Sequence, residues 1–312
     1  MKNIKIIFFG SSDFSMPILL RLFENFNVCA VVTESDKPSG RNKKIAPLPV
    51  KIIAEEKNIP VLQPDNLKNE DFFNKIKSFD ADLMVTASYG KILPESIINL
   101  PKHGSLNAHP SLLPKYRGPS PIQSALLDGE KTTGSTIILM DNSMDGGDIL
   151  NQTEMEISED EDYVSLEKKL AEQCAELLVK VIPNYIDSKI EPQAQNNDKA
   201  TYCRKISKKD GRIDWQKTAA AISGQIKAFA KWPVAYSFYK NQKIEILKAG
   251  LTELTITVKF KSGEIVKIDK KVCVICGAGF IELIKVKLEG KNETGINDFI
   301  NGHQDFVGAI LK

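Results

Sequence analysis

The chain has 312 residues, 42% of them hydrophobic and 26% charged, a composition that suits a globular protein with enough residues for two domains. No apolar run approaches the roughly 18 residues of a membrane span, and the apolar start is too short for a secretory signal, so we expect a cytoplasmic protein that does not insert into membranes. The five scattered cysteines argue against a disulfide framework and agree with a reducing compartment.

The first part of the chain alternates short apolar runs, which predict strands, with amphipathic segments, which predict helices. The expected strands are 5–9, 28–33, 61–62, 83–87, 104–108 and 136–140, and the expected helices are 15–26, 49–57, 71–78, 122–127 and 162–186. Strands that alternate with helices favour βαβ units around a parallel sheet. We therefore expect residues 1–187 to form a Rossmann-like α/β domain.

Residues 188–206 are predicted to be a linker, because 188–200 are polar and lack periodicity. Beyond them the pattern changes to one helix and closely spaced segments rich in β-branched residues. The expected helix is 218–230, and the expected strands are 236–239, 243–249, 254–260, 263–268, 272–276 and 280–286. This pattern predicts a second domain over 207–312, a small OB-like β-barrel.

The turn after the first strand argues against a dinucleotide site. Gly10 is the only glycine in FFGSSDFS, whereas a dinucleotide fingerprint needs further glycines that let the backbone approach a pyrophosphate. A P-loop is also absent from the sequence. An NAD-dependent dehydrogenase is therefore not expected.

Asn107 and His109 lie two residues apart at the end of a predicted strand, so their side chains should point to the same side. Open α/β sheets place their ligands at the carboxyl ends of strands. An amide and an imidazole side by side can hydrogen-bond to a carbonyl oxygen that becomes an oxyanion. The alternative is that both residues merely stabilise a turn.

A second polar loop, MDNSMDGGDIL at 140–150, follows another predicted strand. Asp145, next to two glycines, is placed to bring a carboxylate close to His109, which would orient the imidazole and assist proton transfer. Asp141 and Asp148 compete for this role, and the chemistry of the sequence alone does not rank the three. The alternative interpretation is that the loop is an ordinary acidic turn without a catalytic role.

The two loops carry a specific resemblance. NAHPSLLPKYRG at 107–118, followed about thirty residues later by MDNSMDGGD, resembles the superfamily of formyltransferases that use 10-formyltetrahydrofolate. Four further segments narrow the resemblance to the methionyl-tRNA formyltransferase family. They are TESDKPSGRNKKIAPLPVK at 33–51, VTASYGKILP at 85–94, YCRKISKKDGRIDW at 202–215 and KAFAKWPVAY at 227–236. The resemblance covers nearly the whole chain.

This resemblance implies an enzyme that moves a formyl group from 10-formyltetrahydrofolate to the amino group of methionine on initiator tRNA, without a metal. Asn107, His109 and Asp145 match the catalytic residues of the family. The residues that match its folate-binding segments are Ser111, Leu112, Leu113, Pro114, Lys91, Ile92, Leu93, Met140 and Asp141. Small departures occur at Pro110 and at Pro119–Ser120, and Pro110 leaves open whether the backbone of the folate loop is altered.

The resemblance also implies a tRNA-binding surface. Residues 207–312 carry 18 Lys and Arg against 11 Asp and Glu, a net charge of +7, whereas the rest of the chain has a net charge of −5. A basic C-terminal part is typical of a polyanion-binding protein, although solvated lysines are also common without a partner. The predicted tRNA-binding residues are Arg41, Lys43, Lys44, Lys205, Lys208 and Lys209. We expect the protein to be a monomer.

Three alternatives remain. A sugar-nucleotide N-formyltransferase shares the folate donor and the catalytic residues but would not need the basic 34–49 loop. Glycinamide ribonucleotide formyltransferase would lack the C-terminal domain. A non-catalytic RNA-binding module would leave Asn107, His109 and Asp145 unexplained. The Cys273 and Cys276 pair is interpreted as structural thiols, because residues three apart in a strand face opposite sides and no second Cys or His pair completes a zinc site.

Overall fold

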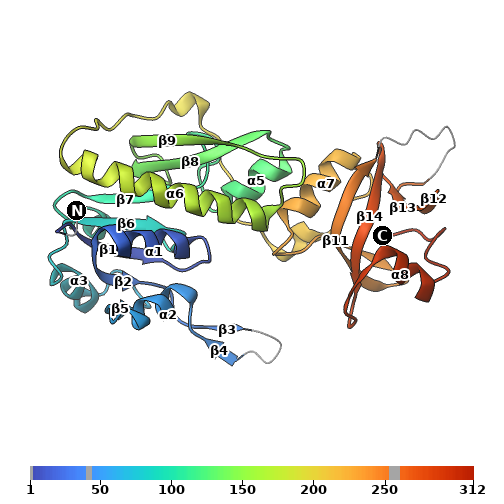
Figure 1. Cartoon of the computed structure of the whole chain (residues 1–312), viewed down its shortest axis with the longest axis horizontal. Coiled ribbons are helices and arrows are strands. Elements are labelled where there is room, and N and C mark those ends of the chain that lie inside the picture. The colour runs from blue at the N-terminus through green and yellow to red at the C-terminus, as the bar shows by residue number, and fades with distance from the viewer. Residues whose placement is uncertain (1–2, 40–43, 253–260) are drawn as a thin grey trace. The chain divides into compact units, whose positions relative to one another are not determined.

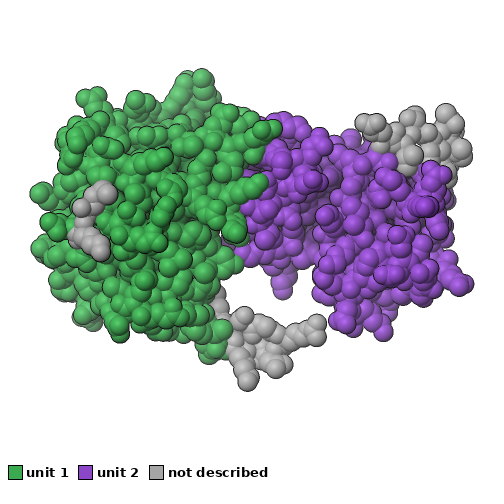
Figure 2. All heavy atoms as spheres, viewed as in Figure 1, with its two compact units in different colours: residues 1–121, 132–156, 167–203 green, residues 122–131, 157–166, 204–312 purple. Residues whose placement is uncertain are grey.

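The computed structural model describes residues 3–39, 44–252 and 261–312. The chain divides into two compact units (Figure 2). The first unit comprises residues 1–121, 132–156 and 167–203, and the second comprises 122–131, 157–166 and 204–312. The domain limits expected at residues 187 and 207 stay a prediction. No helix in the described ranges is long and apolar enough to cross a bilayer.

The first unit is built on a seven-stranded sheet with the order β5-β2-β1-β6-β7-β8-β9. Its strands are β1 Lys5–Gly10, β2 Asn27–Val32, β5 Val61–Leu62, β6 Leu83–Ala87, β7 Ser105–His109, β8 Thr132–Leu139 and β9 Ile149–Glu156. The first five in this order pair in parallel, which confirms the predicted Rossmann-like sheet. β8 and β9 add to it in antiparallel fashion.

Helices flank the sheet, and their ends follow from local sequence. The helices of the first unit are α1 Ser15–Asn25, α2 Pro49–Glu56, α3 Glu70–Lys77, α4 Glu95–Ile98 and most of α6 Tyr163–Ile186, whereas α5 Pro121–Leu127 belongs to the second unit except for its first residue. α3 begins where the Asn69 side chain accepts a hydrogen bond from the Phe72 amide, an ordinary N-cap. α1 and α6 lie side by side (Figure 1), joined by Arg21 and Glu176. A short hairpin of β3 Lys37–Ser39 and β4 Lys44–Ala46 follows β2.

The buried residues of α3 and α4 pack against alternate residues of the central strands. Ile7 and Phe9 of β1 and Met84 of β6 belong to this cluster, together with Tyr89 and Leu93 after β6. The apolar runs predicted as strands are buried on both sides, as parallel strands under helices require. Residues two apart in a strand share a face of the sheet, so Asn107 and His109 of β7 lie on the same side.

The second unit contains an antiparallel sheet with the order β10-β11-β14-β13-β12, to which β15 adds beside β14. Its strands are β10 Tyr236–Tyr239, β11 Gln242–Thr252, β12 Ile265–Ile268, β13 Lys271–Ile275, β14 Phe280–Leu288 and β15 Glu293–Gly295. The other helices of the second unit are α7 Ala219–Ala228 and α8 Ile296–Gly302. The strand expected at 254–260 lies outside the described residues.

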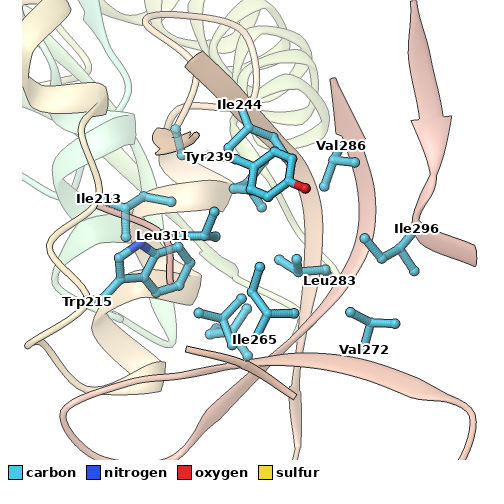
Figure 3. Packing of buried hydrophobic residues seen from close by; sticks show 14 of the residues in the cluster. Ile213, Trp215, Tyr239, Ile244, Ile265, Val272, Leu283, Val286, Ile296 and Leu311 are labelled. Atoms are coloured by element: carbon cyan, nitrogen blue, oxygen red, sulfur yellow. The ribbon is translucent and has the colours of Figure 1, made fainter. Parts of the chain in front are cut away.

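The core of the second unit lies inside this curved sheet (Figure 3). Trp215 is 4% exposed, and its indole Nε1 donates to Ser237 Oγ at 2.9 Å, so the polar atom of a large core side chain is satisfied. Cys276 belongs to this core, whereas Cys273 packs in a separate cluster with Ile275 and Phe280. Burial raises the pKa of the Cys273 thiol to about 11 and that of Cys276 to about 12. The predicted small β-domain, and with it the fold class, is confirmed.

Candidate active site

The predicted catalytic side chains meet in the first unit. Asn107 Nδ2 donates to Asp145 Oδ1 at 3.1 Å, and His109 Nδ1 lies 3.7 Å from Asp145 Oδ2. The same carboxylate oxygen accepts the backbone N–H of Gly118 at 2.8 Å. His109 is only 4% exposed, and its Nε2 lies 2.9 Å from the Tyr116 carbonyl oxygen. The structure therefore brings the amide, the imidazole and the carboxylate into one cluster.

The arrangement around His109 constrains its protons. A carbonyl oxygen can only accept, so Nε2 carries the hydrogen that bonds to Tyr116. A second proton on Nδ1 would point toward the Asp145 carboxylate, whereas a bare Nδ1 would set a lone pair against it. The structure thus sets a carboxylate beside the second nitrogen of the imidazole, an arrangement that suits proton transfer.

The loop of Asp145 does not start at the carboxyl end of β7, where the sequence places the ligand-binding loops. β8 runs antiparallel to β7, so its last residues lie at the start of β7, and the Met140 amide bonds to the Ser105 carbonyl at 2.8 Å. The loop over 141–148 brings Asp145 to Asn107 and returns to the end of β8, where the Leu139 amide donates to the Asp148 carbonyl at 2.8 Å. Asp145 adopts a positive φ of 51°, a region that Asp tolerates better than most residues. Of the competitors, Asp141 is exposed and accepts from the Ser143 amide at 2.8 Å.

The loop from Pro110 to Gly118 is held by its own hydrogen bonds and by β8. Ser111 is fully buried, and its hydroxyl donates to the Lys115 carbonyl at 2.7 Å. Thr136 of β8 donates to the Ser111 carbonyl at 2.6 Å and accepts from the Leu113 amide at 3.2 Å. Leu113 is 3% exposed, whereas Leu112 and Pro114 are partly exposed. Pro110 therefore begins a loop with a fixed backbone.

The remaining predicted folate residues have unequal surroundings. Lys91 Nζ donates to the Pro64 carbonyl at 2.8 Å, which anchors the turn after β6. Ile92 is 85% exposed, but Leu93 is 5% exposed and belongs to the cluster under α3 and α4. Met140 packs against the same cluster. The structure thus places an exposed apolar side chain and two more buried ones around the turn.

Two buried hydroxyls, one in β6 and one in the turn after it, make no hydrogen bond within the described residues. Thr86 Oγ1 and Tyr89 Oη have no partner, and the two residues are 7% and 2% exposed. Thr86 is the register neighbour of Asn107 across β6 and β7. Burial, followed by the charge of Glu34, raises the pKa of the Tyr89 hydroxyl well above its usual value. The Thr86 hydroxyl, without a partner beside Asn107, suits a polar ligand edge.

Residues outside the predicted set complete the cluster. Arg117 is 4% exposed, and its guanidinium bonds to Gln195, Asn197 and Tyr202. Gln195 in turn donates to the Asp145 and Gly147 carbonyls. These contacts come from the segment expected to be a linker, which runs along the site instead. Arg117 lies within the NAHPSLLPKYRG motif, but the sequence predicts no role for it, because arginines are mostly exposed.

A cysteine also lies near the site, although none occurs in the two predicted loops. The Cys203 thiol donates to the Arg117 carbonyl at 3.3 Å and accepts from the Ser120 amide at 3.3 Å. Burial raises the pKa of the thiol, and the nearby charge of Asp145 acts in the same direction. The thiol form is therefore favoured over the nucleophilic thiolate. Among the residues that the structure describes, no group of His, Cys, Asp and Glu forms a candidate metal site.

The predicted tRNA-binding residues divide into two groups. Arg41 and Lys43 lie outside the described residues, and Lys44 is the first residue of β4. In the second unit, Lys205, Lys208 and Lys209 are exposed, the last two on a 3-10 turn over Lys208–Gly211.

This lysine-bearing turn is held by Asp210. Its carboxylate accepts from the Ser207 amide at 2.6 Å and from Arg204 Nη1 at 2.9 Å. The hydrogen bond from Arg204 is the main cause that holds the pKa of Asp210 far below its usual value. The lysines therefore extend from a turn whose backbone is fixed by an ion pair.

Comparison with known proteins shows the family of the chain. Residues 2–182 match the formyl transferase family, and residues 205–304 match the formyl transferase C-terminal domain. The methionyl-tRNA formyltransferase of Caldanaerobacter subterraneus subsp. tengcongensis is 39% identical over 99% of this chain and 100% of its own length.

Two solved structures share the fold. The N-formyltransferase of Helicobacter canadensis, in complex with folinic acid and dTDP-3-aminofucose, has a TM-score of 0.65 at 21% identity and covers 90% of this chain and 98% of its own. The methionyl-tRNA formyltransferase of Clostridium thermocellum has a TM-score of 0.55 at 18% identity and covers 80% of this chain and 94% of its own. With the match over the full length of its relatives, the chain belongs to the methionyl-tRNA formyltransferase family.

Proposed function

We propose that Asn107, His109 and Asp145 catalyse the reaction of this enzyme. As a member of its family, the chain transfers a formyl group from 10-formyltetrahydrofolate to the amino group of methionyl-tRNA. The observation that carries the assignment is the Asp145 carboxylate, which accepts from Asn107 Nδ2 at 3.1 Å and faces His109 Nδ1 at 3.7 Å. An oxyanion donor, a proton carrier and an anchoring carboxylate are the groups that acyl transfer to an amine requires.

The roles of the three side chains follow from their hydrogen bonds. The folate supplies the formyl group. The Asn107 amide has two N–H groups and gives one to Asp145, so the second is available to the formyl oxygen as negative charge develops there. His109, held between Tyr116 and Asp145, stabilises that charge as an imidazolium. The Asp145 carboxylate accepts the proton that the attacking amine loses. The bond between the formyl carbon and the folate nitrogen then breaks, and that nitrogen takes up a proton as the folate leaves.

Side chains at the end of β6 and in the turn after it fit a folate ring system. Ile92 offers an exposed apolar surface, while the hydroxyls of Thr86 and Tyr89 are buried and have no partner within the described residues. A flat heterocycle with polar edges is a ligand that such a mixture suits. We assign the folate to this region, with the segments Lys91–Leu93 and Ser111–Pro114, and with Met140 and Asp141, as its contacts.

For the tRNA, we propose that Lys205, Lys208 and Lys209 contact backbone phosphates, because all three are exposed and the turn carrying two of them is fixed by Asp210. Phosphate contacts position a nucleic acid without reading its sequence. Arg41, Lys43 and Lys44 are assigned to the same substrate on their sequence match alone.

The lysines are tested by reversing all three to Glu. The log–log salt slope of tRNA binding should flatten by roughly 0.7–0.9 for each phosphate that is no longer neutralised, while folate affinity should stay unchanged. A matched control reverses three lysines of the first unit, Lys68, Lys75 and Lys77, to Glu. If the Lys205, Lys208 and Lys209 variant kept the slope of the wild type, this docking surface would be wrong.

The acceptor is tested by offering methionyl-tRNA and a dTDP-aminosugar separately with 10-formyltetrahydrofolate. We expect formylation of the tRNA-bound methionine and not of the sugar amine. Formylation of the sugar alone would replace the proposed function with the sugar-nucleotide reaction.

We also propose that the enzyme is a monomer and acts in the cytoplasm, where translation supplies its tRNA substrate. Sedimentation at micromolar concentration tests the first statement, and fractionation of cells tests the second. A stable dimer, or recovery with the membrane fraction, would contradict them.

A further inference from the structure

Arg117 is a buried arginine whose hydrogen-bond partners are all neutral groups of the described residues. It is 4% exposed, yet within the described residues the acceptors of its guanidinium hydrogen bonds are uncharged. Nε and Nη2 donate to Gln195 Oε1 at 3.0 and 2.8 Å, Nη2 donates to Asn197 Oδ1 at 2.8 Å, and Nη1 donates to Tyr202 Oη at 3.2 Å. A buried charge without a carboxylate partner costs stability. The role of Arg117 therefore lies in the groups that its hydrogen bonds hold in place.

The bonds of Arg117 determine the orientation of the Gln195 amide. A guanidinium has donors only, so Gln195 must turn its oxygen toward Arg117 and its NH₂ group away. That NH₂ group donates to the Asp145 carbonyl at 2.9 Å and to the Gly147 carbonyl at 2.7 Å. Gln195 therefore transmits the position of Arg117 to the loop that carries the catalytic carboxylate.

The loop needs external support. Asp145 has a φ of 51°, a conformation that costs energy in a residue other than glycine. Gly147 lies so close to β8 that an added Cβ would be 2.0 Å from the Leu139 carbonyl oxygen. With both carbonyls bonded to Gln195, the 145–146 and 147–148 peptide groups are held on either side of the Gly146–Gly147 peptide. The Asp145 side chain is then directed at Asn107 and Gly118.

The segment that carries Gln195 is itself anchored to the loop of Arg117. The Arg117 amide donates to the Thr201 carbonyl at 2.9 Å, and the Cys203 amide donates to the Arg117 carbonyl at 2.8 Å. At its other end, Gln193 exchanges two backbone hydrogen bonds with Ile149 of β9. The distance between Arg117 and Gln195 is thereby set by backbone pairing rather than by the two side chains alone.

We propose that Arg117 and Gln195 are positioning residues that hold the Asp145 carboxylate in its reactive place, an inference that rests on the proposed function of Asp145. Gln195 is the specific element, because it combines an acceptor for Arg117 with donors for the Asp145 and Gly147 carbonyls. Neither residue needs to contact a substrate.

Gln195→Glu separates positioning from stability. The carboxylate still accepts from Arg117, now with a charge-assisted bond, but it has no hydrogen for the two carbonyls. The melting temperature should therefore not fall, whereas kcat should fall on the order of 10²-fold, the effect of misplacing a reacting group by about 1 Å. KM for folate and for tRNA should change less than about threefold. Gln193→Glu, the same change at an exposed position of this segment, is the matched control.

Hydrogen exchange supplies a readout that does not depend on activity. The amides of 145–148 should exchange faster in Gln195→Glu than in the wild type or in Gln193→Glu. Equal exchange, or equal kcat in the two Glu variants, would overturn the positioning role. A wild-type protein that formylated neither acceptor would instead overturn the proposed function, while the exchange result would still decide whether Gln195 holds the loop.

Discussion

Replacing Asp145 with Asn keeps the shape of the side chain and removes its charge. In the structure the carboxylate lies 3.7 Å from His109 Nδ1. At an effective dielectric constant of about 20, two unit charges at that distance attract by roughly 4 kcal/mol. If the imidazolium is stabilised by this attraction in the transition state, its removal corresponds to roughly a 10³-fold lower kcat. Because Asp145 is partly exposed, solvent and salt screen its charge, so the smallest expected fall in kcat is roughly 10²-fold.

The assay is the pH dependence of kcat for three variants, Asp145→Asn, Asp141→Asn and Asp148→Asn. We expect the first to lose turnover, because His109 no longer has a carboxylate partner. The other two should lose far less turnover, since Asp141 contacts Ser143 in its own exposed turn rather than His109. Equal activity in all three variants would refute the reasoning and remove the carboxylate from the mechanism.

Further predictions concern the other catalytic residues, the loop and the lysine-bearing turn. Asn107→Ala or His109→Ala should lower turnover by about 10²–10³-fold with little change in folate affinity, and near-native turnover would refute the assignment. Gly147→Ala should destabilise the fold by about 1–3 kcal/mol in thermal unfolding, because its Cβ would lie 2.0 Å from a backbone oxygen, whereas Gly302→Ala should not. Arg204 lowers the pKa of Asp210 below the usual 3.8. The charged Asp210 therefore contributes its full stabilisation of the folded protein above pH 3.8, and this contribution is lost as the pH falls further. Asp210→Asn should therefore be less stable than the wild type at pH 7, with a difference that shrinks toward pH 2.

The sequence predicts the fold well where physical patterns are strong. The buried strands and amphipathic helices of the first unit lie within a few residues of their expected positions, because parallel strands under helices are continuous apolar runs. β9 is not predicted, since an edge strand such as Ile149–Glu156 alternates buried and exposed residues and is largely polar. α8 is not predicted either, because a helix of seven residues shows too little periodicity.

The candidate site is predictable only in part. Asn107 and His109 follow from their spacing at the end of a strand, but the choice of Asp145 over its neighbours depends on family resemblance. Its actual position depends on the antiparallel direction of β8, which no local pattern reveals. Gln195 is hidden in a segment that looks like a linker, because its order comes from hydrogen bonds to distant residues. Such tertiary contacts leave no periodic trace in the sequence.

The most direct test of the central claim follows the formyl carbon itself. The protein is mixed with ¹³C-formyl-labelled 10-formyltetrahydrofolate and methionyl-tRNA, and the methionine released from the tRNA is analysed by mass spectrometry. We predict that the label appears on the α-amino group of methionine, and that Asp145→Asn slows its appearance on the order of 10²–10³-fold. Label that stays on the folate, or that reaches methionine equally fast in the variant, would contradict the account.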